Sequence, residues 1–270
     1  MRPNTVKRLL QEGKPAIGTW LGLGSPLAAE WLAHQGFDWL NIEQEHGAID
    51  ATLTQSLLQA ISTTDVIPLI RIPWKSPDYC KRALDAGAYG LFVPTVNTRE
   101  EAELMVGAMK YPPAGFRGLG GTRRQLYGGS DYVQHANDEI LVILMIETAE
   151  GVRNAEDILS VPGVDACFVG PNDLAMSLGL SPTLDPLFPE YEEAIGKILR
   201  ACKNHGVAPG VHTPSAERCA DRIEQGWQLN AINSDGGFMA QAATAAVKTV
   251  RERTGAAPVA QEEAITRPQY

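Results

Sequence analysis

A run of acidic, amide and histidine side chains, Asn41-Ile-Glu-Gln-Glu-His-Gly47, stands at the end of an apolar segment. Histidine changes charge near neutral pH, so it is the usual residue for moving protons in a reaction. His46, beside Glu43 and Glu45, is therefore a candidate acid–base group. A histidine among acids in a loop is more often solvated or structural, so this run alone identifies no reaction.

The same pattern, an apolar run that leads to a charged residue, recurs along the chain at Arg71, Glu147 and Asp173. Arg71 lies between apolar residues, which is a poor place for a surface ion pair. Glu147 directly follows seven apolar residues, and a buried carboxylate there must be paired or bound to a metal, because an isolated buried charge is costly. Two further segments end in residues that we assign to the edge of a pocket, His212 and Asp235.

Glu147 and Asp173 together indicate a cation site. Two carboxylates from adjacent strands, with no His or Cys beside them, suit a hard ion such as Mg²⁺ or Mn²⁺. A Zn²⁺ site would normally include His or Cys ligands. Asp173 has an alternative role as the cap of a short helix that begins after it.

These residues need a scaffold that brings distant strand ends together. Apolar strands are predicted at residues 16–20, 37–42, 66–70, 90–93, 140–146, 166–169, 207–211 and 229–232. Amphipathic helices are predicted at residues 26–34, 49–62, 77–86, 98–109, 149–159, 188–205, 216–225 and 238–253. Eight strand–helix pairs predict an α/β fold, the TIM (β/α)8 barrel, whose chemistry lies at the carboxyl ends of the strands.

An open doubly wound sheet is the alternative fold, but no Gly-rich nucleotide fingerprint follows the first strand. We predict one barrel domain over residues 1–253 and a C-terminal tail over residues 254–270. Within a long loop at residues 111–139, the segment Gly115–Gly129 combines glycines with three arginines. This segment is either a flexible surface loop or a lid that draws in a carboxylate substrate.

The composition limits the classes of partner that the protein can bind. The 270 residues carry a formal net charge of −9, without a block of Lys and Arg, which argues against nucleic acid or an anionic membrane as partner. Met1-Arg-Pro-Asn4 has no apolar signal region, and no apolar run approaches the roughly 20 residues that span a bilayer. We therefore expect a soluble, cytoplasmic protein that acts on a small molecule.

In combination, the motifs resemble the HpcH/HpaI aldolases, which are metal-dependent (class II) pyruvate aldolases of the phosphoenolpyruvate/pyruvate barrel superfamily. The matching segments run in order along the chain: Gly18-Thr-Trp20, Phe37-Asp-Trp39, Glu45-His-Gly47, Ile70-Arg-Ile-Pro-Trp74, Leu84-Asp-Ala-Gly-Ala88, Val93-Pro-Thr-Val96, Tyr111-Pro-Pro113, Arg117-Gly118, Ile146-Glu-Thr148 and Phe168-Val-Gly-Pro-Asn-Asp-Leu174. Each segment alone is a weak signal, and together they are specific.

The resemblance implies a role for each matching position. Glu147 and Asp173 are the implied metal ligands, and Arg71 is the implied contact of the keto oxygen that becomes the enolate. His46 is the implied acid–base residue, paired with Asp85, which in such proteins can come from a neighbouring subunit. The implied substrate-binding positions are Trp20, Gly170, Asn172 and Glu43.

The implied reaction is the reversible aldol cleavage of a 4-hydroxy-2-oxo acid to pyruvate and an aldehyde, with Mg²⁺, Mn²⁺ or Co²⁺, in a homo-oligomer such as a hexamer. A class I mechanism would need a buried lysine, and only Lys75 lies near a strand end. The alternatives are oxaloacetate decarboxylation of the macrophomate synthase type and a barrel that binds a 2-oxo acid without catalysis. Glu43 and Met145, where many members have Asp and Gln, leave the preferred reaction open.

Overall fold

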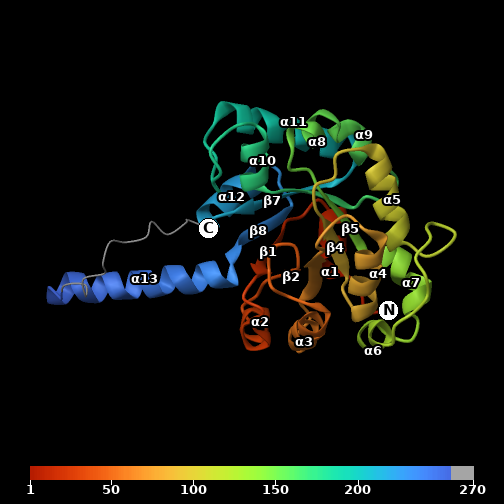
Figure 1. The fold of residues 1–270 in the computed structure, drawn as a ribbon, viewed down its shortest axis with the longest axis horizontal. Helices are drawn as coiled ribbons and strands as arrows, with labels where there is room; N and C mark the ends of the chain where they lie inside the picture. The colour runs from red at the N-terminus through yellow and green to blue at the C-terminus, as the bar shows by residue number, and fades with distance from the viewer. Residues whose placement is uncertain (257–270) are drawn as a thin grey trace.

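The structure, a computed structural model, describes residues 1–256 as a closed barrel of eight parallel strands in sequence order, with β1 beside β8 (Figure 1). The strands are β1 (Ala16–Leu21), β2 (Trp39–Glu43), β3 (Ile67–Arg71), β4 (Gly90–Val93), β5 (Leu141–Met145), β6 (Ala166–Val169), β7 (Ala208–Thr213) and β8 (Leu229–Ser234). Each predicted strand is present, with ends that differ by a few residues. The barrel prediction is confirmed.

Helices follow the strands and surround most of the barrel. They are α1 (Thr5–Gln11), α2 (Pro26–Ala33), α3 (Ala51–Ile61), α4 (Pro77–Ala86), α5 (Arg99–Met109), α6 (Arg123–Gly128), α7 (Tyr132–Glu139), α8 (Ala149–Arg153), α9 (Ala155–Leu159), α10 (Pro171–Ser177), α11 (Pro189–His205), α12 (Ala216–Glu224) and α13 (Asp235–Thr254). Several differ from expectation: α1 was not predicted, and α6 and α7 form within the long loop. The short helix α10 begins at Pro171 with Gly170 as its N-cap, so Asp173 lies in its first turn and does not cap it. The helix predicted at 149–159 is divided at Asn154, whose ψ of 8° interrupts the helical backbone.

Aromatic side chains fill the inside of the barrel. The ring centroids of Phe92 and Phe168 lie 4.9 Å apart, edge to face, and Trp20 packs on both rings. Small residues on other strands make room for them, since a Cβ placed on Gly210 would lie 2.7 Å from the Phe168 ring. The interior is therefore a packed core and not a channel, as is usual for this fold.

The N-terminal segment covers the amino end of the barrel. Asn4 caps α1 through a 3.0 Å bond from the Lys7 N–H, and its side-chain amide donates to the carbonyls of Tyr89 and Glu139. The buried Lys7 ammonium lies 2.8 Å from an Asp165 carboxylate oxygen. These polar contacts hold α1 in place, which leaves the carboxyl end of the barrel for a site.

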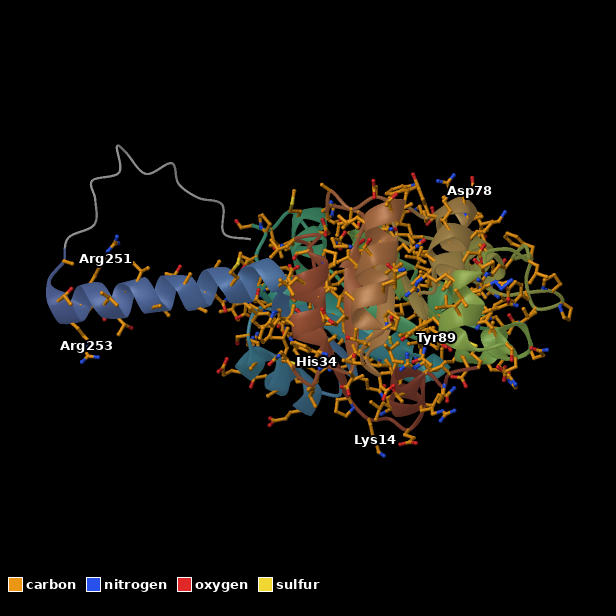
Figure 2. The ribbon with its side chains drawn as sticks, turned by 90° about the horizontal axis from the view of Figure 1, so that it is seen from below. Lys14, His34, Asp78, Tyr89, Arg251 and Arg253 are labelled. Atoms are coloured by element: carbon orange, nitrogen blue, oxygen red, sulfur yellow. The ribbon has the colours of Figure 1, made fainter. Side chains whose placement is uncertain are left out.

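The last helix, α13, extends away from the barrel, and Figure 2 shows Arg251 and Arg253 at its far end. Only Asp235, in its first turn, is buried. Apolar side chains along the rest are exposed, among them Met239 and Val250. The helix ends at Thr254, and residues 257–270 of the predicted tail lie outside the described residues. Within the described part of the chain, we find no helix with the length and hydropathy needed to cross a membrane.

Candidate active site

A pocket of about 760 Å³ opens at the carboxyl ends of the strands. Most of the predicted site residues line it, although they come from six different strands or the loops behind them. The lining includes Trp20, Glu43, His46, Arg71, Gly170, Asn172 and Asp173, and the predicted pocket-edge residues His212 and Asp235. Glu147 is buried at the Gly170 wall of this pocket, and Asp85 lies elsewhere.

Two carboxylates meet over Gly170. Glu147 is 3% exposed, and its Oε2 atom is buried without a hydrogen-bond partner. A Cβ placed on Gly170 would lie 2.5 Å from that oxygen and 3.4 Å from Oδ2 of Asp173, which faces the pocket. The absence of a side chain at Gly170 therefore lets the two acids approach one point.

The electrostatics of this pair favour a cation. Burial, and next the negative charge of Asp173, raise the pKa of Glu147 to about 7. A divalent ion with oxygen ligands would fit here, because it would neutralise both carboxylates and engage the unpartnered oxygen. Among residues 1–256, no group of three or more His, Cys, Asp or Glu side chains is placed to hold a metal. Two protein ligands would leave the other coordination positions to water and substrate oxygens.

Arg71 is held by two acids and an aromatic ring. Its Nε donates to Oε2 of Glu43 at 2.6 Å, and its Nη1 lies 3.2 Å from Oε2 of Glu45. The guanidinium carbon is 4.7 Å from the centre of the Trp20 ring. The other Glu43 oxygen accepts the backbone N–H groups of Glu45 and His46. Burial raises the pKa of Glu45 to about 7, against the opposing charge of Arg71.

His46 and Asp85 do not meet within one chain. The His46 side chain is 65% exposed, and its Nε2 lies 3.8 Å from Glu45. Asp85 is in the last turn of α4, which ends beside the amino end of β4, so it lies at the opposite end of the barrel. There its Oδ1 accepts a 3.0 Å bond from Arg117 and lies 3.7 Å from Arg124 Nε.

The glycine- and arginine-containing segment at 115–129 also lies at the amino end, because it connects α5 to β5. Arg117 and Arg124 are 3% and 4% exposed, and Arg123 donates to the carbonyl of Ala86. The segment does not cover this chain's own pocket, so the lid interpretation does not hold within the single chain. It lies at the surface, where Leu119 is exposed, but two of its three arginines are buried.

The structure adds Thr95 to the site and shows the contacts of His212, which was predicted at the pocket edge. Thr95 donates to Glu147 through its backbone N–H and its hydroxyl, although the sequence marked it only as part of a motif. His212 donates through Nε2 to the carbonyl of Asn233 at 2.9 Å and packs against Trp20. Burial lowers the pKa of His212 to about 4, so this ring is neutral near pH 7. His46 is the other histidine that lines the pocket, and its side chain is exposed.

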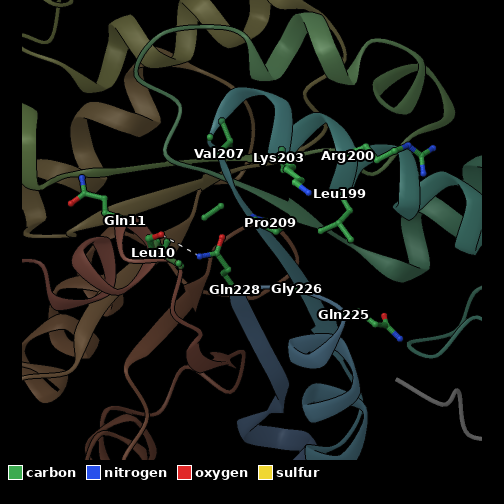
Figure 3. Close-up of a pocket in the computed structure, with 14 residues that line it drawn as sticks. Leu10, Gln11, Leu199, Arg200, Lys203, Val207, Pro209, Gln225, Gly226 and Gln228 are labelled. Carbon is green, nitrogen blue, oxygen red and sulfur yellow. Dashed lines mark hydrogen bonds between the residues drawn. The ribbon is translucent and has the colours of Figure 1, made fainter.

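A second cavity, of about 520 Å³, lies at the amino end between α1 and α11 (Figure 3). Its lining includes Leu10, Lys203 and Pro209, and Gln228 donates to the carbonyl of Leu10 at 3.2 Å. None of the described residues that line it is a carboxylate or a histidine. This cavity therefore lacks the carboxylate and histidine side chains that line the pocket at the carboxyl end.

Comparison with known proteins agrees with the barrel fold. The model of the HpcH/HpaI aldolase/citrate lyase family matches residues 16–242. The chain is 38% identical over 245 residues to 4-hydroxy-2-oxo-heptane-1,7-dioate aldolase from Escherichia coli, which covers 90% of this chain and 93% of that protein. The crystal structure of an HpcH/HpaI aldolase/citrate lyase family protein from Burkholderia cenocepacia J2315 superposes with a TM-score of 0.87 at 38% identity, over 92% of this chain and 99% of that one. The crystal structure of macrophomate synthase superposes with a TM-score of 0.81 at 25% identity, over 92% of this chain and 89% of that one.

Proposed function

The chain belongs to the HpcH/HpaI aldolase/citrate lyase family and is a carbon–carbon lyase, and on this premise we propose that it cleaves 4-hydroxy-2-oxo acids reversibly to pyruvate and an aldehyde. The observation that carries the proposal is the meeting of Glu147 and Asp173 over Gly170, beside the pocket that contains Arg71. Such cleavage leaves the electrons of the broken C3–C4 bond on pyruvate as an enolate. A site for it must place positive charge at the 2-oxo oxygen.

A divalent cation, Mg²⁺ or Mn²⁺, would be held by Glu147 and Asp173. When bound, it supplies a Lewis acid for the substrate's carboxylate and 2-oxo oxygens. The protein's own contribution at that oxygen is Arg71, whose orientation is set by Glu43 and Glu45. The backbone around Gly170 and Asn172 is proposed to hold the substrate carboxylate, and Trp20 forms the wall behind Arg71.

His46 is proposed to take the proton from the C4 hydroxyl during cleavage and to return it during addition. Its imidazole is exposed in the single chain, so it has room for a partner from another subunit. We propose that the partner is Asp85 of a neighbouring copy. The exposed apolar residues of α13 support a homo-oligomer, because such a surface is normally covered in an assembly, and family resemblance implies a hexamer.

A Schiff-base mechanism is disfavoured by the contacts of Lys75. Its ammonium donates to the carbonyl of Thr95 at 2.8 Å and is paired with Glu101, so it is engaged away from the pocket. Chelator should abolish cleavage, and Mg²⁺ or Mn²⁺ should restore it. Borohydride with pyruvate should leave activity intact. Chelator-resistant activity that borohydride destroys would contradict the metal mechanism.

Oxaloacetate decarboxylation is a second candidate, because it forms the same pyruvate enolate by loss of CO₂. Met145 favours it. This apolar side chain lines the pocket beside Gly170, where the motif of many members has a polar residue. Pyruvate release from oxaloacetate and from a panel of 4-hydroxy-2-oxo acids, compared as kcat/KM, would decide between the two reactions. Failure of pyruvate to exchange C3 protons in D₂O would indicate a barrel that binds without catalysis.

A further inference from the structure

Thr95 makes the two oxygens of the Glu147 carboxylate different. Its backbone N–H and its hydroxyl donate to the same oxygen, Oε1, at 2.8 and 3.1 Å. The other oxygen, Oε2, is buried without a partner and lies over Gly170, on the side of Asp173. One oxygen is thus held, and the other is presented to the point where the two acids meet.

The backbone of Thr95 adopts a conformation that threonine rarely takes. Its φ is +53°, in the left-handed region where a β-branched side chain is crowded. Among the described residues other than glycine, the one further case of positive φ is Asn233, which lines the pocket. Such conformations persist where surrounding contacts hold them, and they cluster at functional sites.

Contacts on both sides of Thr95 hold this conformation. Lys75 donates to its carbonyl at 2.8 Å, and Lys75 is itself paired with Glu101. The next residue, Val96, donates its backbone N–H to the carbonyl of Met145 at 3.0 Å, at the end of β5. The turn after β4 is thereby attached to the strand that leads to Glu147, so both donors of Thr95 stay aimed at Oε1.

We propose that Thr95 is a positioning residue for the cation site, which it serves by orienting Glu147 so that Oε2 faces Asp173. This inference rests on the proposed function, in which these two carboxylates hold a divalent ion. A ligand carboxylate that loses a hydrogen-bond partner is free to rotate in its pocket. Changes to such supporting contacts typically weaken metal affinity by about 10- to 100-fold.

The test compares three variants of the full chain, freed of metal. Thr95→Val removes the hydroxyl and keeps the shape and the backbone N–H, whereas Thr95→Ser keeps the hydroxyl. Thr52→Val is the matched control, because Thr52 is exposed on α3. Titration calorimetry with Mn²⁺ should show Kd raised about tenfold or more for Thr95→Val. Thr95→Ser and Thr52→Val should bind as the wild type does.

Thr95→Gly separates positioning from a merely structural role. Glycine accepts a positive φ without crowding, so the metal-free variant should keep or gain thermal stability while its Mn²⁺ affinity falls. Wild-type Kd values in both Thr95→Val and Thr95→Gly would overturn this inference and leave the proposed function standing. A wild-type protein that binds no Mn²⁺ would overturn the cation site and this inference together.

Discussion

Arg71 donates a 2.6 Å hydrogen bond from Nε to Oε2 of Glu43, and these two residues are register partners at the carboxyl ends of β3 and β2. The second Glu43 oxygen accepts the backbone N–H groups of Glu45 and His46. One carboxylate therefore positions both the arginine proposed to contact the keto oxygen and the backbone of the proposed acid–base histidine.

We expect Glu43→Asp to lower kcat/KM for aldol cleavage about 10- to 100-fold, because the shorter side chain cannot hold Arg71 and the loop backbone at once, and small misplacements in a site are costly. Pyruvate release measured under steady-state conditions checks this. Glu224→Asp, at the exposed end of α12, is the control and should match the wild type. Undiminished kcat/KM in Glu43→Asp would show that this carboxylate does not position Arg71.

We expect Gly170→Ala to abolish Mn²⁺ binding and to reduce activity by roughly 100-fold or more, since the new methyl group would occupy the meeting point of Glu147 and Asp173. Circular dichroism should show an intact barrel. Gly196→Ala is the matched control, because a Cβ there, on α11, would meet only the end of Arg200, at 3.5 Å. If Gly170→Ala bound Mn²⁺ normally, the proposed ligand pair would be wrong.

Glu147 should make the metal-free protein less stable as the pH rises from about 4.5 to about 7. Burial raises the pKa of Glu147 from 4.5 to about 7, so the folded state holds this proton more tightly than the unfolded chain does. Raising the pH through that window deprotonates the unfolded chain first, which lowers the free energy of unfolding by roughly 3 kcal/mol for this group. Urea unfolding in EDTA at pH 5, 6 and 7 measures the loss.

Glu147→Gln should remove this contribution, which is the difference between the pH profiles of the wild type and the variant. Two other pocket groups contribute to both profiles with opposite signs, because burial raises the pKa of Glu45 to about 7 and lowers the pKa of His212 to about 4. Saturating Mn²⁺ at pH 7.5 should restore stability to the wild type and not to Glu147→Gln, because the ion binds only the folded state. A pH dependence that is the same in wild type and Glu147→Gln would contradict the assigned shift.

We expect His46→Ala and Asp85→Asn each to lower kcat by about 10²- to 10⁴-fold, the range for a lost acid–base group. If the pair forms between subunits, co-expression of the two variants should restore part of the activity. A mixed assembly then contains some sites with an intact His46 from one chain and an intact Asp85 from the other. Activity measured on doubly tagged, purified mixtures checks this.

His34→Ala, which alters an exposed histidine at the end of α2, is the control for the histidine substitution and should be fully active. A mixture with only the sum of the two residual activities would indicate that Asp85 serves its own chain. In the structure, Asp85 forms ion pairs within its own chain, with Arg117 and Arg124.

Apolar runs made the strands predictable, because a strand buried on both faces of a barrel carries few polar residues. The charged residues that end those runs, such as Arg71 and Glu147, followed from the same pattern. The short helix α1 was not predictable in this way, since its seven residues are held by Asn4 and Lys7 through contacts with distant backbone. The position of the segment at 115–129 was not predictable, because glycine and arginine content does not say which end of a barrel a loop occupies.

By itself, the sequence determined the barrel, its strand order and the acids expected at the strand ends, because those depend on hydrophobic pattern and local propensity. Only the tertiary structure decided which atoms meet. It paired Arg71 with Glu43, aimed the unpartnered oxygen of Glu147 toward Asp173, and separated His46 from Asp85 within one chain. Such contacts depend on backbone torsions and on how eight strands close, and the linear pattern of residues does not encode them directly.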